Sequence, residues 1–142
     1  MDQLAAVEIP EVVRRFLAGP HIGTLATVSP SGAPHQAAVW YRLDPDGRIL
    51  VNSRDGRLWP ANLRRDARCS LSVIDAADGY RWVGLECRVE AIVDDVETAR
   101  DDIVALADRY GGAKPETIAA FRSQLRISFH LVVVRIHDHL GG

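Results

Sequence analysis

The segment 53–66 carries the side chains that best suit an anion. It places a hydroxyl, two arginines and an amide around a glycine turn and a short helix: Ser53, Arg54, Gly56, Arg57 and Asn62. A helix N-terminus presents free backbone N–H groups, and a guanidinium group can donate two parallel hydrogen bonds to a phosphate. We therefore interpret this segment as a candidate phosphate site. The alternative is a surface turn followed by a solvated helix, since Arg64 and Arg65 would also suit a face in water.

Aromatic side chains form a second group of candidates. Tyr80 and Trp82 share one face of an expected strand, and the opposite face of that strand is apolar. Large aromatic rings outside a core usually mark a partner interface or the site of a flat ligand. Packing beneath a loop would explain them equally well, and the same question arises for Trp40 in an earlier strand.

No other group of residues has a recognisable catalytic or metal signature. His137 and His139 share one face of an extended segment, as two metal ligands would, but no third ligand has a suitable spacing. Cys69 and Cys87 fall in expected strands and suit a core better than a nucleophilic site. The sequence has no Walker loop, dinucleotide fingerprint or nucleophile elbow. We therefore expect no metal and no catalytic side chain.

The composition indicates one globular domain over residues 1–142. The formal net charge is −2, with 47% hydrophobic and 25% charged residues, values that are typical of folded rather than disordered chains. The balanced charge argues against a nucleic-acid partner, and no apolar run is long enough to cross a membrane. The acidic start of the sequence does not suit a signal peptide, so we expect a cytoplasmic protein.

Apolar spacing and turn residues predict the elements that must position these side chains. Strands are expected at residues 21–29, 36–43, 48–53, 69–74, 80–93 and 131–136, and helices at 10–17, 60–65, 96–110 and 115–125. The odd positions of 80–93 are apolar from Val83 onwards, which indicates one buried face. Because the helices do not alternate with the strands, we predict a mainly β fold with α-helices, a six-stranded antiparallel β-barrel with external helices.

Several stretches in the same order resemble the pyridoxamine-phosphate-oxidase-like split-barrel superfamily. They are Ile22–Val28, Gly32–His35, Val39–Tyr41, Asn62–Leu71 and Tyr80–Val89. The run that begins Asn-Leu-Arg-Arg-Asp is similar to a signature of the deazaflavin branch, the flavin/deazaflavin oxidoreductases of type B, which are common in actinobacteria. The similarity covers about residues 8–135.

The resemblance implies an FMN-binding split β-barrel that forms a homodimer, with the cofactor in a groove shared by both subunits. Such proteins bind the cofactor phosphate, hold the cofactor ring and receive an aromatic edge from the partner subunit. The resemblance assigns a set of positions in this sequence to each of these three roles. These are Ser53, Arg57 and Asn62 for the phosphate, Ala38, Val39 and Trp40 for the ring, and Asp78, Tyr80 and Trp82 for the edge.

Trp59 departs from the family pattern. Many relatives carry a lysine at this position, where it contacts the phosphate, and an indole cannot neutralise a phosphate. The resemblance then implies that phosphate affinity comes from Arg57, from Arg54 and from the helix N-terminus. Trp59 could instead stack on the cofactor tail.

The activity implied by the resemblance is hydride transfer between coenzyme F420 and a small organic substrate of quinone, unsaturated carbonyl or tetrapyrrole type. A deazaflavin carries this chemistry itself, so no side-chain triad is needed. Two alternatives stay open on the same fold. One is an FMN-dependent enzyme similar to pyridoxamine-phosphate oxidase, and the other is a non-catalytic cofactor-binding or haem-binding protein.

Overall fold

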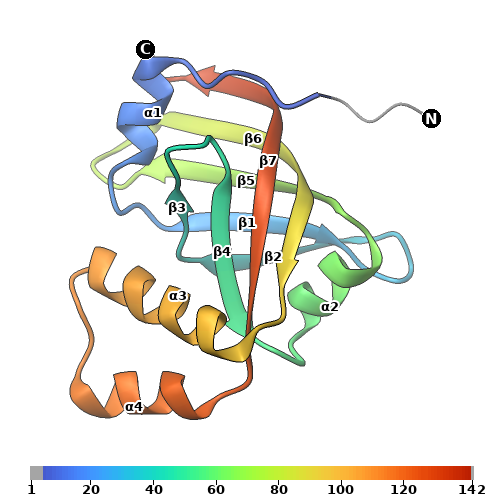
Figure 1. The fold of residues 1–142 in the computed structure, drawn as a ribbon. Helices are drawn as coiled ribbons and strands as arrows, with labels where there is room; N and C mark the ends of the chain where they lie inside the picture. The colour runs from blue at the N-terminus through green and yellow to red at the C-terminus, as the bar shows by residue number, and fades with distance from the viewer. Residues whose placement is uncertain (1–4, 142) are drawn as a thin grey trace.

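A curled antiparallel sheet forms the body of the protein in the computed structural model, which describes residues 5–141. Its seven strands are β1 (Gly23–Val28), β2 (Pro34–Val39), β3 (Arg42–Leu43), β4 (Ile49–Arg54), β5 (Arg68–Asp75), β6 (Asp78–Val93) and β7 (Arg126–His139). They follow the order β2-β1-β5-β6-β7-β4-β3 across the sheet. The sheet curls so that β4 and β7 cross over β1, β2 and β5 (Figure 1).

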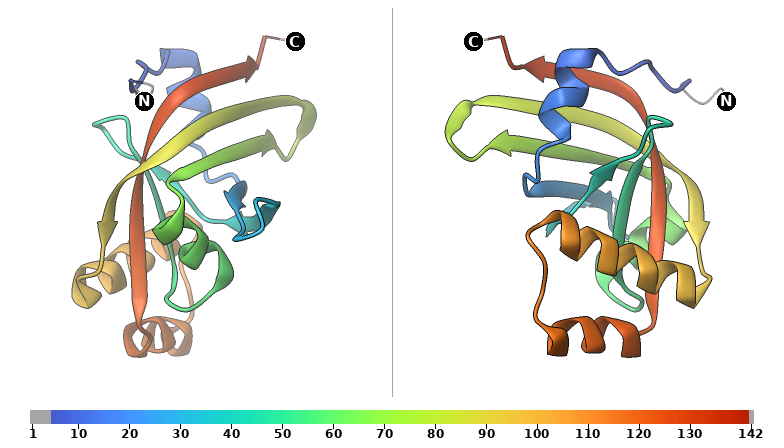
Figure 2. Two further views of the ribbon diagram at one scale, coloured as in Figure 1. Left: turned by 90° about the vertical axis from the view of Figure 1, so that its right-hand side faces the viewer. Right: turned by 60° about the vertical axis from the view of Figure 1, so that its left-hand side comes forward.

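Four helices of the described chain lie outside this sheet: α1 (Glu11–Leu17), α2 (Leu58–Arg65), α3 (Val96–Arg109) and α4 (Pro115–Ser123). The helix α3 begins after Asp95, whose carboxylate accepts a hydrogen bond from the backbone N–H of Thr98 as an N-cap. It packs across β4 and β7, and α4 lies on its far side (Figure 2). None of these helices is long and apolar enough to cross a membrane.

The curl of the sheet comes from its two longest strands, β6 and β7. Their pairing register shifts between Glu86 and Cys87 and again between Val89 and Ala91. Irregularities of this kind bend a strand and increase its twist. The first part of β6 therefore pairs with β5, while its end continues down to α3 (Figure 2).

Apolar side chains fill the inside of the curled sheet. Inward-facing residues of β1, β5 and β6 are almost fully buried, namely Leu25, Leu71, Val73, Val83 and Leu85. The strand β4 is buried on both faces, because Ile49 and Val51 join this core while Leu50 packs on the opposite side. There α3 covers Leu50 with Ile103 and Leu106. The end of β4 is thus held from both sides, which makes it a rigid support for the side chains that follow.

The predicted fold class, a mainly β barrel with external helices, is confirmed, but the expected strand at 36–43 is broken. The strand β2 ends at Val39, and β3 pairs only Arg42–Leu43 with β4. Between them Tyr41 turns into the core, where its hydroxyl donates to the carbonyl oxygen of Leu17 at 2.9 Å. This break makes seven strands where six were predicted.

The last strand is also longer than the predicted 131–136. It begins at Arg126, and its first residues pair with β4. Polar residues such as Arg126 and Ser128 alternate with Ile127 and Phe129 in this part, and all four are buried. The predicted strand did not include these residues because the continuous apolar run begins only at Leu131.

Candidate functional site

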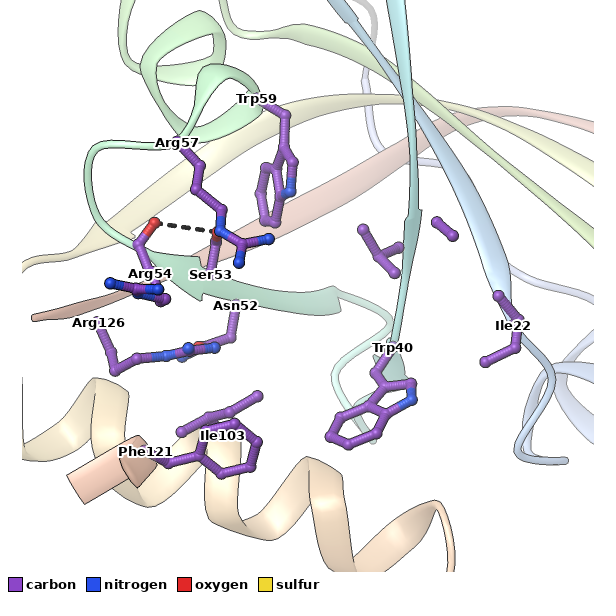
Figure 3. Close-up of a pocket in the computed structure, with 12 residues that line it drawn as sticks. Ile22, Trp40, Asn52, Ser53, Arg54, Arg57, Trp59, Ile103, Phe121 and Arg126 are labelled. Atoms are coloured by element: carbon purple, nitrogen blue, oxygen red, sulfur yellow. Dashed lines mark hydrogen bonds between the residues drawn. The ribbon is translucent and has the colours of Figure 1, made fainter. Parts of the chain in front are cut away.

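A pocket of about 350 Å³ lies where the ends of β2 and β4 meet the start of β7. The helix α2 borders it through Trp59, and the helices α3 and α4 border it through Ile103 and Phe121 (Figure 3). One end of the pocket is basic and the other is aromatic and apolar. The residues at its two ends come from segments far apart in the sequence, so the curl of the sheet is what brings them together.

Three arginines form the basic end: Arg54, Arg57 and Arg126. Arg54 and Arg126 stand directly opposite each other on the paired strands β4 and β7. Like charges at such positions destabilise a sheet. In the described part of the chain, no ion pair or side-chain hydrogen bond is formed by Arg54 or Arg57. The basic end therefore has a net positive charge that no acidic side chain offsets locally.

Arg126 is the buried member of this group, with 7% of its surface exposed. Its Nε and Nη2 atoms donate to Oδ1 of Asn52 at 3.0 and 2.9 Å, and Nη1 donates to Oε1 of Gln124 at 2.8 Å. Its guanidinium carbon lies 5.3 Å from the centre of the Phe121 ring. Burial, and then the charges of Arg57 and Arg54, lower the pKa of Arg126 to about 10.

A helix N-terminus adjoins the same end of the pocket. The helix α2 follows Gly56, whose φ of 96° suits glycine best, and no side chain caps its first turn. Ser53 lies beside it, and its hydroxyl donates to the carbonyl oxygen of Arg54 at 3.0 Å (Figure 3). Backbone N–H groups and unpaired guanidinium groups together form a favourable site for an anion.

The opposite end of the pocket is lined by Trp40, Ile22 and Val39, while Ile103 and Phe121 lie between the two ends, with the Phe121 ring against Arg126 (Figure 3). The indole of Trp40 stacks on the ring of Tyr110, with ring centres 5.3 Å apart and an interplanar angle of 12°. The hydroxyl of Tyr110 donates to the carbonyl oxygen of His21 at 2.6 Å and accepts from the backbone N–H of Tyr41 at 3.2 Å. Trp40 is therefore held in place from behind, and this end of the pocket suits a flat ring.

Seven of the predicted site residues line this pocket: Ala38, Val39, Trp40, Ser53, Arg54, Arg57 and Trp59. Asn62 does not. Its side chain is fully buried, with Nδ2 donating to Oγ1 of Thr27 at 3.0 Å and Oδ1 accepting from Arg65. Its amide joins α2 to β1 and is not available to a phosphate in the pocket.

Trp59 lies at the edge of the pocket but belongs mainly to the core. It is 7% exposed, and its ring packs against Phe129 with centres 5.9 Å apart. Little of the indole is thus free to stack on a cofactor tail.

Asp78, Tyr80 and Trp82 lie at the start of β6, in the hairpin with β5, and none of them lines the pocket of its own chain. Tyr80 is 90% exposed. Trp82 stacks on His139 with ring centres 4.0 Å apart. The structure therefore leaves their predicted role dependent on a second subunit.

Sequence reasoning missed Arg126, Asn52, Ile103, Phe121 and Ile22 as pocket residues. Ile22, Ile103 and Phe121 carry no local signal, because the sequence does not distinguish an apolar side chain in a core from one in a pocket wall. Arg126 offered one clue, a lone arginine before a run of β-branched and aromatic residues. Its pairing opposite Arg54 depends on the register of β4 and β7, which the sequence does not show.

The lining of the pocket suits binding better than acid–base chemistry. It contains three cations and one amide but no carboxylate, histidine or cysteine. Elsewhere in residues 5–141, no group of three potential ligands could hold a metal ion. The pocket can therefore hold an anionic group at one end and a ring at the other, while the chemistry has to come from what is bound.

Comparison with known proteins points to one family. The sequence profile described as pyridoxamine 5'-phosphate oxidase matches residues 9–139. A curated F420H(2)-dependent biliverdin reductase of Mycobacterium tuberculosis is 33% identical over 101 residues, which cover 70% of this chain and 71% of that protein.

Solved structures agree with this result. A structure named F420 reductase superposes with a TM-score of 0.80 and 28% identity, covering 91% of this chain and 98% of that one. A conserved hypothetical protein of Mycobacterium tuberculosis superposes with a TM-score of 0.73 and 29% identity, covering 98% of this chain and 91% of that one. Since the profile spans almost the whole described chain and the fold agrees, the protein belongs to the pyridoxamine 5'-phosphate oxidase family.

Proposed function

We propose that the protein is an oxidoreductase that transfers a hydride between coenzyme F420 and a small organic substrate. The observation that carries the proposal is one pocket with unneutralised arginines at one end and a supported indole at the other. Coenzyme F420 matches this arrangement, because it joins a flat deazaflavin ring to an anionic tail. The relatives named F420H(2)-dependent biliverdin reductase and F420 reductase support the same cofactor.

Each part of the pocket then has a binding role. Arg54, Arg57 and the first turn of α2 hold the phosphate, with Ser53 as a further donor once its hydroxyl turns away from the backbone. The ring lies against Ala38, Val39 and Trp40 at the end of β2. When bound, the deazaflavin supplies or accepts the hydride at its own ring carbon, and the protein orients it and limits access of water.

We also propose that the protein acts as a homodimer, in which Asp78, Tyr80 and Trp82 of one subunit complete the groove of the other. The exposure of Tyr80 supports this arrangement. The substrate would then enter a groove bounded by both subunits. A quinone, an unsaturated carbonyl compound or a tetrapyrrole remains our prediction for the substrate, and the cytoplasm remains our prediction for the location.

The two alternatives differ in what they require of the pocket. FMN also joins a flat ring to a phosphate, so the same residues would fit it. Haem fits less well, because haem iron needs an axial ligand such as His, Cys, Met or Tyr. No such residue is found among those that line the pocket.

Titration of the purified protein with F420 and, separately, with FMN tests the proposal. We expect saturable binding of F420, seen as a change in its fluorescence, and weaker binding of FMN. Tighter binding of FMN than of F420 would favour the FMN enzyme. Binding of neither cofactor would overturn the proposal, and a Soret band after addition of haem would then favour haem binding.

A further inference from the structure

Arg126 carries a buried charge that the protein does not neutralise. Its three side-chain hydrogen bonds go to neutral amide oxygens, those of Asn52 and Gln124. A buried charge is costly unless it is paired. Its position opposite Arg54 adds repulsion to that cost. Because neither these amide oxygens nor the Phe121 ring beneath the guanidinium group neutralises the charge, its presence at a pocket wall points to a ligand.

The guanidinium group of Arg126 is nevertheless firmly held. Asn52 accepts from it and in turn donates through Nδ2 to the carbonyl oxygen of Ala99 and to Oγ of Ser128, both at 2.8 Å. Ser128 donates to Asp102 of α3 at 2.7 Å. These contacts fix the group before any ligand arrives, so little side-chain entropy is lost on binding.

Two of the five N–H groups of Arg126 have no acceptor in the described chain, since three are used by Asn52 and Gln124. Arg126 also lines the pocket, and the charges of Arg54 and Arg57 are close enough to lower its pKa. An anionic group bound between Arg54, Arg57 and Arg126 would contact all three cations. Its charge would offset the repulsion that they exert on one another.

We propose that Arg126 is an inner ligand of the anionic part of the cofactor, and that it makes the pocket select the phosphorylated cofactor over the same ring without a phosphate. This inference rests on the proposed function, because it concerns the same pocket. It adds to the exposed Arg54 and Arg57 a third phosphate ligand, which is buried and comes from a distant part of the sequence.

The test compares F420 with its dephosphorylated core, the deazaflavin that ends at the ribityl chain. We expect Arg126→Gln to weaken F420 binding about ten- to a hundredfold, the range of a lost charge-assisted hydrogen bond. Binding of the core without its phosphate-bearing tail should change less than about twofold. Arg126→Lys should lie between, because it keeps the charge but loses the planar fork.

Arg122→Gln is the matched control. Arg122 also lies near α3, but it is exposed, pairs with Asp101 at 2.5 Å and does not line the pocket. Its substitution should leave both dissociation constants unchanged. The inference is wrong if Arg126→Gln binds F420 as tightly as the parent, or if it weakens both ligands equally, as a structural role would. It is also wrong if the parent binds both ligands equally, whereas a parent that binds neither ligand overturns the proposed function itself.

Inorganic pyrophosphate gives a second measurement that needs no cofactor. At matched ionic strength it should raise the Tm of the parent at least twice as much as the Tm of Arg126→Gln, because binding to the native state stabilises it. An equal rise in both proteins, or no rise in the parent, would contradict the inference. Comparing the Tm values without pyrophosphate shows whether the variant is folded.

Discussion

At the scale of single residues, the arginines that line the pocket differ from those that pair with acids on the surface. The chain has 17 basic residues, and several arginines on its surface pair with acids, as Arg64 does with Asp55 and Asp94 and Arg68 does with Asp66. Such exposed pairs contribute little to stability. The three arginines that line the pocket have no acidic partner in the described chain, so their charges are available to an anionic ligand.

Arg57 gives the first prediction. Arg57→Ala should weaken cofactor binding about ten- to a hundredfold, because a charge-assisted hydrogen bond contributes roughly 1.5–3 kcal/mol. The Tm of the protein without cofactor should hardly change, since the side chain is exposed and makes no contact that supports the core. Fluorescence titration and thermal unfolding measure the two effects.

Arg64→Ala is the control for this prediction. The side chain is a cation of the same α2 segment, but Asp55 and Asp94 already pair with it. The Arg64→Ala substitution should therefore leave cofactor affinity unchanged. Equal losses in Arg57→Ala and Arg64→Ala would mean that general surface charge, and not the pocket, attracts the cofactor.

The two cysteines give a prediction about pH. Burial raises the pKa of the Cys69 thiol to about 12, with a smaller effect from Asp66, and raises that of Cys87 as well. The unfolded chain therefore loses these protons near pH 9 while the folded chain keeps them. Stability should fall as pH rises from about 9 to 12, because the unfolded state binds fewer protons there.

Urea unfolding at pH 8 and pH 10 measures this loss. Both thiols should also react with a disulfide reagent slowly in the native protein and fast in urea, because the thiolate is the reactive form. Cys69→Ala should reduce the pH dependence. Rapid native labelling at pH 8 would show that at least one thiol is not held in the core as the structure has it.

Local patterns predicted part of the candidate site and not the rest. Ser53, Arg54 and Arg57 were found because they stand beside a glycine turn and a helix start, which is a local signature. Asn62 belongs to the same segment, but the helix turns its side chain toward Thr27. Arg126 was missed because its role depends on strand pairing across more than seventy residues.

At the scale of elements, the end of α3 fastens the N-terminal segment to the wall of the pocket. Arg109 donates to the carbonyl oxygens of Leu17, Ala18 and Gly19, which follow the end of α1, and to that of Tyr41 at 2.8 Å. A cation at a helix C-terminus donates hydrogen bonds to carbonyl groups that lack partners and interacts favourably with the helix dipole. Tyr110 follows directly and supports Trp40.

Arg109→Ala should therefore destabilise the protein by about 2–4 kcal/mol, since it removes four charge-assisted hydrogen bonds and leaves the carbonyl oxygen of Ala18 without a donor in the described chain. Arg109→Lys should recover only part of the loss, because an ammonium group cannot span the same acceptors. Urea unfolding measures the change. Arg15→Ala should have an effect within about 0.5 kcal/mol, because Arg15 is exposed and pairs only with Glu11. Similar losses in Arg109→Ala and Arg15→Ala would contradict this role.

The elements themselves were largely predictable, except where a strand is buried with polar residues. Helix starts such as Asp95 and Pro115 carry strong local signals, and the structure begins α3 and α4 there. The start of β7 carries no such signal, because Arg126 and Ser128 are buried by contacts with Asn52 that the periodicity of the sequence does not reveal. The break after β2 follows from the inward turn of Tyr41, which depends on packing against α1.

At the scale of the whole molecule, the hairpin of β5 and β6 carries apolar surface that the single chain leaves in water. Tyr80 is 90% exposed and Ile74 is 52% exposed, and Ile74 pairs with Trp82 across the hairpin. Exposed apolar groups gathered in one place usually mark an interface. A stable dimer interface buries more than about 1,000 Å² in total. The same hairpin is the edge that the proposed homodimer places beside the pocket of the other subunit.

Sedimentation should therefore give twice the chain mass of 15.6 kDa at micromolar concentration. Tyr80→Lys should shift the protein toward the monomer, because a lysine keeps its charge in water and opposes burial at an apolar contact. It should also weaken F420 binding, even though Tyr80 does not line the pocket of its own chain. This joint loss is the result that distinguishes a shared groove from two independent pockets.

Tyr80→Phe provides the matched control, because it keeps the ring and removes only the hydroxyl group. It should remain dimeric and bind F420 like the parent. If Tyr80→Lys becomes monomeric but keeps full affinity, the dimer is correct and the groove is not shared. If the parent itself sediments as a monomer and still binds F420 tightly, both the dimer and the shared groove are wrong, and the arginines of a single chain must then hold the cofactor alone.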